Sequence, residues 1–258
     1  MQGPEDGPVL LFAHGFGCDQ DMFSRILPFF VDDYRLVLFD HVGSGGSTLD
    51  SYDPVDYSGL ERYARDLVEI CDALALHDVT VIAHSVGSAM ALLASIDRPE
   101  LFSRLVLVAP SPSYIDDAAD DYVGGLSADD VSDLLDSLDD NHLAWAAAMA
   151  PVVMANTEHP VLVDELERSF CRVDPGVMRT FARVTFLSDV RAQLSGVTVP
   201  SLILQCSDDA LAPASVGEYL HEHLAHSRVV VLRATGHVPQ VSAPEETALA
   251  ILDYLGAA

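Results

Sequence analysis

The sequence contains no lysine, so all 13 of its basic residues are arginine, set against 40 aspartate and glutamate residues. The formal net charge at pH 7 is −27. Nucleic acid and anionic membranes would both have to bind against this field, and no basic run offsets it, so the composition argues against both partners. Two origins of the acidic excess stay open: a saline cytoplasm, where salt screens self-repulsion, and a soluble bacterial enzyme from a GC-rich genome.

Cysteine and long apolar runs are also scarce. The cysteines form no Cys-x-x-Cys pair, which excludes the spacing of a zinc knuckle or a redox motif; they are Cys18, Cys71, Cys171 and Cys206. We therefore expect reduced thiols that are mostly buried. No apolar run reaches the length of a membrane span, and the N-terminus is acidic where a secretion signal would be basic. These absences predict a cytoplasmic protein.

Two short motifs that suggest other chemistry are incomplete. Residues 43–47 read Gly-Ser-Gly-Gly-Ser, but a phosphate-binding P-loop needs a lysine. Residues 221–226 read His-Glu-His-Leu-Ala-His, and the second histidine of a zincin helix would fall at Ala225. We therefore expect neither a metal nor a cofactor.

Strand and helix patterns alternate along much of the chain. Half of the 258 residues are hydrophobic, which suits one α/β domain with an insertion. Short apolar runs bounded by turn residues predict six strands, at residues 9–13, 36–39, 79–83, 105–109, 202–204 and 229–232. Helical periodicity separates most of them, as at residues 60–75 and 244–254. This order predicts a mostly parallel sheet with helices on both faces and a site at the carboxyl ends of its strands.

The alternation stops between residues 110 and 188, where helical segments follow one another without a strand. They are predicted at residues 128–138, 141–149, 160–170 and 175–186. Such a block cannot extend the sheet, so we expect a four-helix lid at 113–187 inserted into a core of residues 1–112 and 188–258. Its aromatic side chains, which include Trp145 and Phe186, are expected to pack within the lid or to line an enclosed cavity.

Residues 79–95 pass in one step from a buried-strand pattern to a helix pattern, with Ser85 at the joint. Residues 83–87 (Ala-His-Ser-Val-Gly) fit the nucleophile elbow, in which small residues on either side permit a strained turn that exposes the serine hydroxyl. The first small residue is alanine rather than glycine. An ordinary strand-to-helix junction remains the alternative, so this motif needs support from others.

Support comes from loops that follow other predicted strands. Residues 14–17 (His-Gly-Phe-Gly) follow the first strand, where backbone amides can face an oxyanion; the candidate donors are the amides of Phe16 and Val86. His237 follows the last strand and is the candidate general base. Asp208 and Asp209 follow the strand at 202–204, and either can supply the acid. The order serine, aspartate, histidine is that of the α/β-hydrolases.

With these residues the chain resembles the α/β-hydrolase family and, within it, the RsbQ-type bacterial energy-stress regulators that are related to plant karrikin and strigolactone receptors. The resemblance is nearly chain-long and rests on residues 14–20, 38–47, 83–87, 98–114 and 197–213. It implies a helical lid with Trp145 and Phe186 against the cavity.

The same resemblance implies roles for single residues. Ser85 is the nucleophile, His237 the base and Asp209 the orienting acid, because the family acid stands four residues before a proline, here Pro213. Phe16 and Val86 are the implied oxyanion donors. At the position three after the catalytic histidine, where the family commonly has another histidine, this chain has a glutamine.

Two functions stay open at this point. The first is a serine hydrolase of a small neutral ester or lactone, acting in a small apolar pocket through Ser85. The second is a ligand-sensing regulatory protein that uses the same pocket, hydrolyses slowly and acts on a phosphatase-type partner, as the resemblance to stress regulators implies. A purely structural role would predict a broken triad, and the triad residues are all present.

Overall fold

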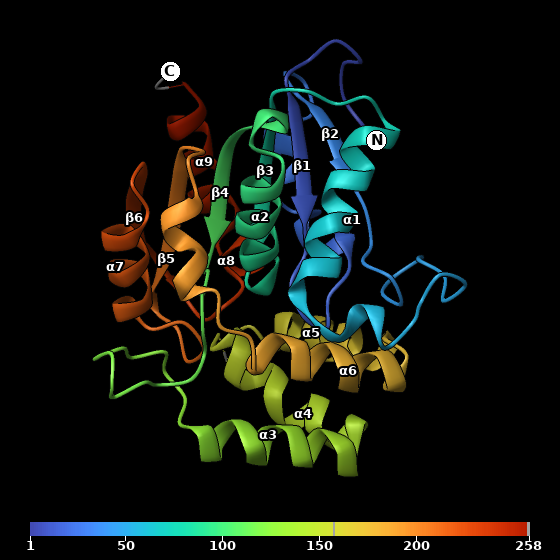
Figure 1. Ribbon diagram of the computed structural model, residues 1–258. Coiled ribbons are helices and arrows are strands. Elements are labelled where there is room, and N and C mark those ends of the chain that lie inside the picture. The colour runs from blue at the N-terminus through green and yellow to red at the C-terminus, as the bar shows by residue number, and fades with distance from the viewer. Residues whose placement is uncertain (157, 257–258) are drawn as a thin grey trace.

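The computed structural model describes residues 1–156 and 158–256. Six parallel strands form one sheet in the order β2-β1-β3-β4-β5-β6 (Figure 1). They are β1 (Val9–Ala13), β2 (Arg35–Leu38), β3 (Val79–His84), β4 (Phe102–Val108), β5 (Ser201–Asp208) and β6 (Ser227–Thr235). All six predicted strands are confirmed. The last two run further than their apolar segments indicated, because backbone pairing continues through polar residues as far as Asp208 and Thr235.

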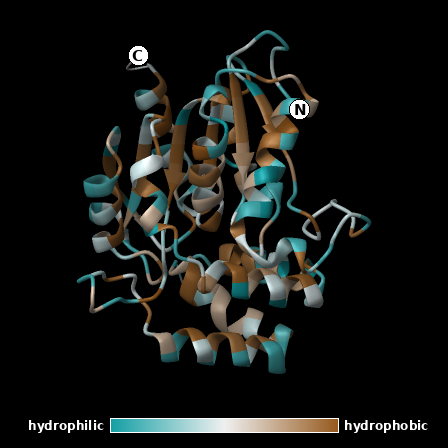
Figure 2. Ribbon diagram, in the orientation of Figure 1, coloured by the Kyte–Doolittle hydropathy of each residue, from teal (hydrophilic) through white to brown (hydrophobic). Residues whose placement is uncertain are grey.

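The strand side chains alternate between two buried clusters, one on each face of the sheet. On β1, Leu10 and Phe12 belong to one cluster, and Leu11 and Ala13 belong to the other. Helices cover both faces, as predicted, and Figure 2 shows most of the strands in brown, the hydrophobic end of its scale.

The helices divide between the two faces. The first cluster is covered by η1 (Gln20–Phe23), η2 (Leu27–Phe29), α8 (Pro239–Ser242) and α9 (Pro244–Gly256), and the second by α1 (Leu60–Ala73), α2 (Val86–Asp97) and α7 (Ala214–His223). Short 3-10 helices complete the core: η3 (Asp56–Ser58), η4 (Pro99–Leu101) and η5 (Arg191–Gly196).

The amphipathic pattern of α1 explains its docking. Its buried residues recur every three or four positions: Leu60, Tyr63, Ala64, Leu67, Val68 and Cys71. The helix ends at Ala73, two residues before the predicted end, because Ala75 takes a left-handed conformation with φ +50°. Helix α2 is buried along most of its surface, since it packs against both the sheet and α1.

Four helices follow β4 and precede β5, which confirms the predicted insertion. They are α3 (Ala128–Asp140), α4 (His142–Met154), α5 (Pro160–Arg172) and α6 (Pro175–Phe186). They lie together beyond the carboxyl ends of the strands (Figure 1). The boundaries of this lid at residues 113 and 187 stay a prediction.

Two further expectations concern cysteines and membranes. All four cysteines are free thiols; Cys18, Cys71 and Cys206 are buried, as expected of most of them, and Cys171 is exposed. Within the described ranges, no helix is both long and apolar enough to span a bilayer.

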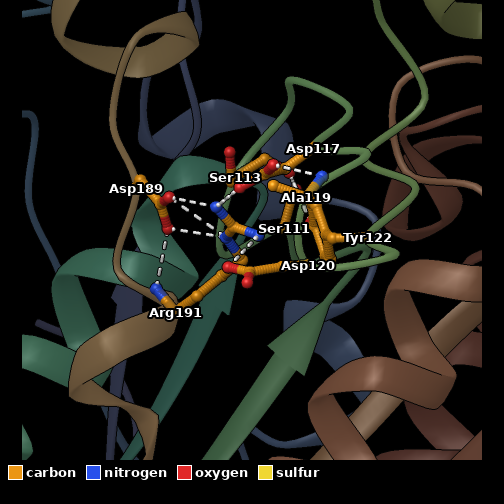
Figure 3. Close-up of polar contacts among 8 residues, drawn as sticks. All are labelled: Ser111, Ser113, Asp117, Ala119, Asp120, Tyr122, Asp189 and Arg191. Atoms are coloured by element: carbon orange, nitrogen blue, oxygen red, sulfur yellow. Dashed lines mark hydrogen bonds and ion pairs between the residues drawn. The ribbon is translucent and has the colours of Figure 1, made fainter.

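The two ends of the lid insertion meet at Arg191 (Figure 3). Its Nη2 atom donates to Asp117, 2.8 Å away, on the segment that enters the lid, and to Asp189, 2.6 Å away, on the segment that leaves it. The guanidinium also lies 4.6 Å from the centre of the Tyr122 ring, and the Tyr122 hydroxyl donates to the carbonyl of Ser113. Arg191, with only 12% of its side chain exposed, therefore connects the segment that precedes the lid helices to the segment that follows them.

These contacts predict a pH-dependent contribution to stability. Hydrogen bonds from Arg191 hold the pKa of Asp117 below its ordinary value. Burial acts in the opposite direction at Asp189, but its bonds from Arg191 outweigh it and the pKa is again lowered. A carboxylate with a lowered pKa in the folded state stabilises the fold above its unfolded pKa of about 3.9, and this contribution disappears as pH falls through the folded value.

We therefore expect Arg191→Met to lower the melting temperature at pH 7, and expect the difference from wild type to shrink as the pH is taken from 5 to below 3. Thermal unfolding followed by circular dichroism across this range measures the effect. The exposed Arg168 on α5 supplies the matched control, because Arg168→Met makes the same change of charge. Equal melting temperatures for the two variants at pH 7 would contradict this account of the junction.

Candidate active site

Ser85 lies between β3 and α2 in a conformation that few residues other than glycine adopt, with φ +55° and ψ −128°. Its amide donates to the carbonyl of Val108 on the neighbouring β4, and its carbonyl accepts from the amide of Ser88. A side chain at Gly87 would place its Cβ 2.8 Å from the carbonyl oxygen of Ala13 at the end of β1, so only glycine fits there. The turn therefore has the geometry of a nucleophile elbow.

The structure brings Ser85, His237 and Asp209 into one hydrogen-bonded line. The Ser85 hydroxyl lies 2.7 Å from His237 Nε2, and His237 Nδ1 lies 2.8 Å from Asp209 Oδ2. All three side chains are buried. Because a carboxylate only accepts, Nδ1 of the neutral imidazole carries the proton, and Nε2 is left to accept the serine proton.

Asp209, and not Asp208, faces His237. Its second oxygen accepts from the amides of Leu211 and Ala212, at 2.9 and 3.2 Å. Burial opposes ionisation, but the neighbouring His237 and these amides outweigh it and lower the pKa of Asp209, so the carboxylate stays charged. Asp208 is the exposed last residue of β5.

The loop after β1 is held by a pair of buried histidines. The amide of His41 donates to His14 Nε2, at 2.9 Å, so the proton of His14 sits on Nδ1 and is donated to the carbonyl of Gly15. Burial lowers the pKa of His14, which keeps the ring neutral. At Gly15 a Cβ would lie 3.0 Å from the Cβ of Ser85, so the loop passes directly beside the nucleophile.

Phe16 follows Gly15 and Val86 follows Ser85, the two residues at which the loop after β1 passes beside the nucleophile. Val86 is the first residue of α2, where amides lack an intrahelical acceptor. Within residues 1–156 and 158–256, neither the Phe16 nor the Val86 amide donates to a protein oxygen. Both amides thus remain available to an oxyanion formed beside Ser85.

Two residues that the sequence reasoning missed also contact the triad. The Tyr114 hydroxyl lies 3.1 Å from the Ser85 hydroxyl, and since the serine donates to His237, the tyrosine is the donor. His84 Nε2 donates to the backbone carbonyl of His237, at 2.7 Å, and burial lowers the pKa of His84 to about 3. The position of Tyr114 shortly after a strand that ends at the same edge was the available signal.

A small cavity opens onto Ser85 beneath the lid. About 30 Å³ of it is open to the centre of a water molecule, room for only a few waters. The predicted Trp145 of α4 and Phe186 of α6 both line it, and each packs edge-on against the Phe16 ring. The remaining lining is mostly apolar, with Met149, Val153, Leu166, Phe170, Leu211 and Val238 among its members.

A larger hollow of about 430 Å³ lies elsewhere, between the start of α1 and α6. Its described lining includes Ser58 and Ser188 but no histidine that could activate them. The small cavity at Ser85 is therefore the better candidate for covalent chemistry.

The C-terminal end of α4 contacts the loop that carries His237. The carbonyl of Val153 accepts from the His237 amide, at 2.8 Å, and the Asn156 side chain donates to the carbonyl of Thr235, at 3.0 Å. Between them, a Cβ at Gly236 would lie 2.1 Å from the carbonyl oxygen of Met154, so the two segments approach to a distance that only glycine allows.

This arrangement can perform nucleophilic catalysis without further groups. Ser85 can attack a carbonyl carbon, His237 can take its proton, Asp209 can stabilise the imidazolium, and two free amides stand nearby. In the part of the chain that the structure describes, no three His, Cys, Asp or Glu side chains are grouped so as to hold a metal ion.

Comparison with known proteins gives a consistent picture. The family model described as "alpha/beta hydrolase fold" matches residues 8–244. A "Karrikin insensitive 2 receptor IA" from Petunia hybrida is 37% identical over 96% of this chain and 90% of its own length. A "Strigolactone esterase D14" from Arabidopsis thaliana is 37% identical over 93% of this chain and 89% of its own. The solved structure of a hydrolase from Oleispira antarctica superposes with a TM-score of 0.95 at 38% identity, over 99% of this chain and 93% of the other.

The geometry distinguishes the two adjacent aspartates. We expect Asp209→Asn to slow the reaction of Ser85 with a fluorophosphonate probe and the hydrolysis of p-nitrophenyl acetate by about three to four orders of magnitude, because the imidazole loses its tautomer and its charge partner. Asp208→Asn, which makes the same change at the exposed neighbour, should alter either rate less than about twofold. A ranking in the opposite order would overturn the choice of acid.

Proposed function

The chain belongs to the α/β-hydrolase fold family, as a serine esterase of that type, and from this premise we propose that its substrate is a small neutral ester or lactone. The observation that carries the proposal is the line from Asp209 through His237 to Ser85, which ends in a small, mostly apolar cavity. Catalytic roles for these three residues are part of the proposal.

The reaction follows from the hydrogen bonds. Ser85 attacks the acyl carbon while its proton passes to His237 Nε2, and the amides of Phe16 and Val86 bind the developing oxyanion. His237 then gives the proton to the leaving alcohol oxygen as the carbon–oxygen bond breaks, which leaves an acyl-enzyme. Water gives a proton to His237 as it attacks the acyl carbon of that intermediate, and His237 then returns the proton to Ser85 Oγ as the bond between Oγ and the acyl carbon breaks, which releases the acid. With a lactone, the alcohol and the acid are parts of one product.

The charge distribution supports a neutral substrate. Among the described residues that line the cavity there is no arginine, so a carboxylate that entered would lose its hydration without gaining a counter-charge. Outside, 40 acidic residues stand against 13 basic ones, and their field repels anions before they reach the lid. A compact uncharged ester avoids both costs.

The lactone part of the proposal draws on the relatives. One is named a strigolactone esterase and another a karrikin receptor, at 37% identity each and over most of this chain. A lactone is a cyclic ester, so the same triad serves both substrate types. Its compact ring also suits a cavity with little free space.

A second candidate function is ligand sensing in the manner of the RsbQ-type regulators, with slow hydrolysis and a phosphatase-type protein partner. One specific observation favours it: lid helix α4 is hydrogen-bonded to the amide of His237. A ligand that moved the lid would therefore move the base as well. The name of the karrikin receptor relative agrees with such a role.

Replacement of the nucleophile tests the proposal directly. We expect Ser85→Ala to lower kcat/KM for p-nitrophenyl acetate by at least about 10⁴-fold while the melting temperature stays within a few degrees, since alanine preserves the turn and removes only the hydroxyl. A fluorophosphonate should label the wild type once, at Ser85, as mass spectrometry of the peptides reports. Hydrolysis by the variant at a rate near that of wild type would refute the assignment.

The preference for uncharged substrates gives a second test. We expect the wild type to hydrolyse phenyl butyrate with kcat/KM at least about tenfold above that for the matched hydrogen phenyl succinate monoanion. Trp145→Ala should reduce this preference, because a wider cavity admits water around the carboxylate. Preference for the anionic ester, or a ratio that Trp145→Ala leaves untouched, would contradict the apolar-cavity account.

A further inference from the structure

The hydroxyl of Thr185 has no partner although it is buried in the wall of the active-site cavity. Thr185 lies on α6 next to Phe186, with 1% of its surface exposed, and it lines the same cavity as Ser85. Among the described residues, no hydrogen-bond partner lies within reach of its Oγ1 atom.

Other helical threonines of this chain behave differently. Thr180, on the same helix, donates to the carbonyl of Gly176, at 3.2 Å, and Thr247 donates to the carbonyl of Ala243, at 2.9 Å. This bond to the residue four before is the ordinary way for a helical threonine to satisfy its hydroxyl. The Thr185 hydroxyl does not make this bond among the described residues, so it remains available to another hydrogen-bond partner.

A second polar atom in the cavity wall is also unpartnered. Trp145 is 4% exposed and lines the cavity, and its indole Nε1 has no acceptor among the described residues. Buried polar groups without a partner are costly, and the residues that line this one cavity carry three of them among the described residues, these two and His84 Nδ1, which needs an explanation. A ligand that supplies the missing partner is such an explanation.

We propose that Thr185 is a specificity-determining residue that binds a second oxygen of the substrate, one that is not part of the reacting ester group. The proposal rests on the proposed function and adds the substrate class: a compact ester or lactone that carries an ether, ring or carbonyl oxygen near its reacting carbonyl. A rotation of about 120° about χ1 brings the hydroxyl of a threonine to the position that its methyl group held, so the contact requires no movement of α6.

The chemistry of the two groups fixes the kind of oxygen. The indole N–H of Trp145 can only donate, and the Thr185 hydroxyl can donate, so both are satisfied by an acceptor. The acceptor is uncharged, because none of the described residues that line the cavity is an arginine that could balance a second anion. A site built to hydrogen-bond one substrate atom discriminates against analogues that lack the atom.

Phenyl methoxyacetate and phenyl butyrate test this class, since they differ only by an ether oxygen in place of a methylene group. The kcat/KM of each is divided by its rate constant for hydroxide-catalysed hydrolysis, which removes the intrinsic difference in reactivity. We expect the normalised value for methoxyacetate to exceed that for butyrate by about tenfold in the wild type. Thr185→Val, which keeps the shape and removes the hydroxyl, should bring the ratio to about one, and Thr185→Ser should keep it within about threefold of wild type.

Binding to the Ser85→Ala protein separates this inference from the proposed function. Trp145 is the single tryptophan of the chain and lines the cavity, so its fluorescence reports occupancy without turnover. One set of results would refute the proposed function and leave the ligand class standing. In it the wild type hydrolyses neither ester, Ser85→Ala binds phenyl methoxyacetate more tightly than phenyl butyrate, and the addition of Thr185→Val to Ser85→Ala abolishes that difference.

The opposite outcomes overturn the inference alone. Equal normalised kcat/KM values for the two esters would overturn it, and so would a preference for phenyl methoxyacetate that persists in Thr185→Val. A third outcome would assign the hydroxyl to a structural water instead. In that outcome Thr185→Val loses both activities equally and melts well below wild type, and Thr185→Ser restores the melting temperature but not the ratio of the two normalised kcat/KM values.

Discussion

The left-handed conformation of Ser85 is the constraint on which the rest of the site depends. A non-glycine residue at φ +55° costs on the order of 1–3 kcal/mol, and it persists only where its surroundings leave no alternative. Here the Ser85 amide is bonded to β4, and Gly87 passes the end of β1 too closely for a side chain. The central position of β3, between those two strands, therefore sets the position of the nucleophile.

Parallel topology delivers the other groups to the same edge. Every strand ends on the side where Ser85 lies, so each loop that follows a strand can contribute a polar group. The loop after β1 brings Phe16, the segment after β4 brings Tyr114, the loop after β5 brings Asp209, and the loop after β6 brings His237. Because β5 and β6 are adjacent, Asp209 and His237 meet directly, although 27 residues separate them in the chain.

This topology also explains what the sequence could and could not predict. Strands, lid helices, Ser85 and His237 follow from periodicity and from motifs placed at strand ends, whereas the choice of Asp209 over Asp208 came from the family resemblance. The contacts of Tyr114 and His84 depend on the direction of single side chains, which period and spacing do not encode. Arg191 and Thr185 were missed for the same reason. Arg191 bonds to residues at both ends of a long insertion, and Thr185 stands out only because its hydroxyl has no hydrogen-bond partner among the described residues.

The lid and the chemistry are physically linked at the end of α4. The space beside Ser85 that the centre of a water molecule can reach is only about 30 Å³, so a ligand larger than the room that the cavity offers would have to displace its walls. If the end of α4 moved outward to achieve this, it would pull the Val153 carbonyl from the His237 amide and disturb the base. Entry that preserves catalysis must therefore come from rearrangement of the cavity side chains or of α5 and α6, which carry no such bond to the His237 loop among the described residues.

That linkage bears on both candidate functions. An enzyme needs the His237 loop to stay fixed through many turnovers, and the contacts that Val153, Met154 and Asn156, at the end of α4, make with this loop hold it so. A sensor needs the same contacts for the opposite purpose, since a ligand large enough to displace α4 would convert occupancy of the cavity into a change at the lid surface. If the proposed functions hold, ligand size decides between them: a compact ester that leaves α4 in place is turned over, whereas a ligand large enough to shift the lid slows its own hydrolysis.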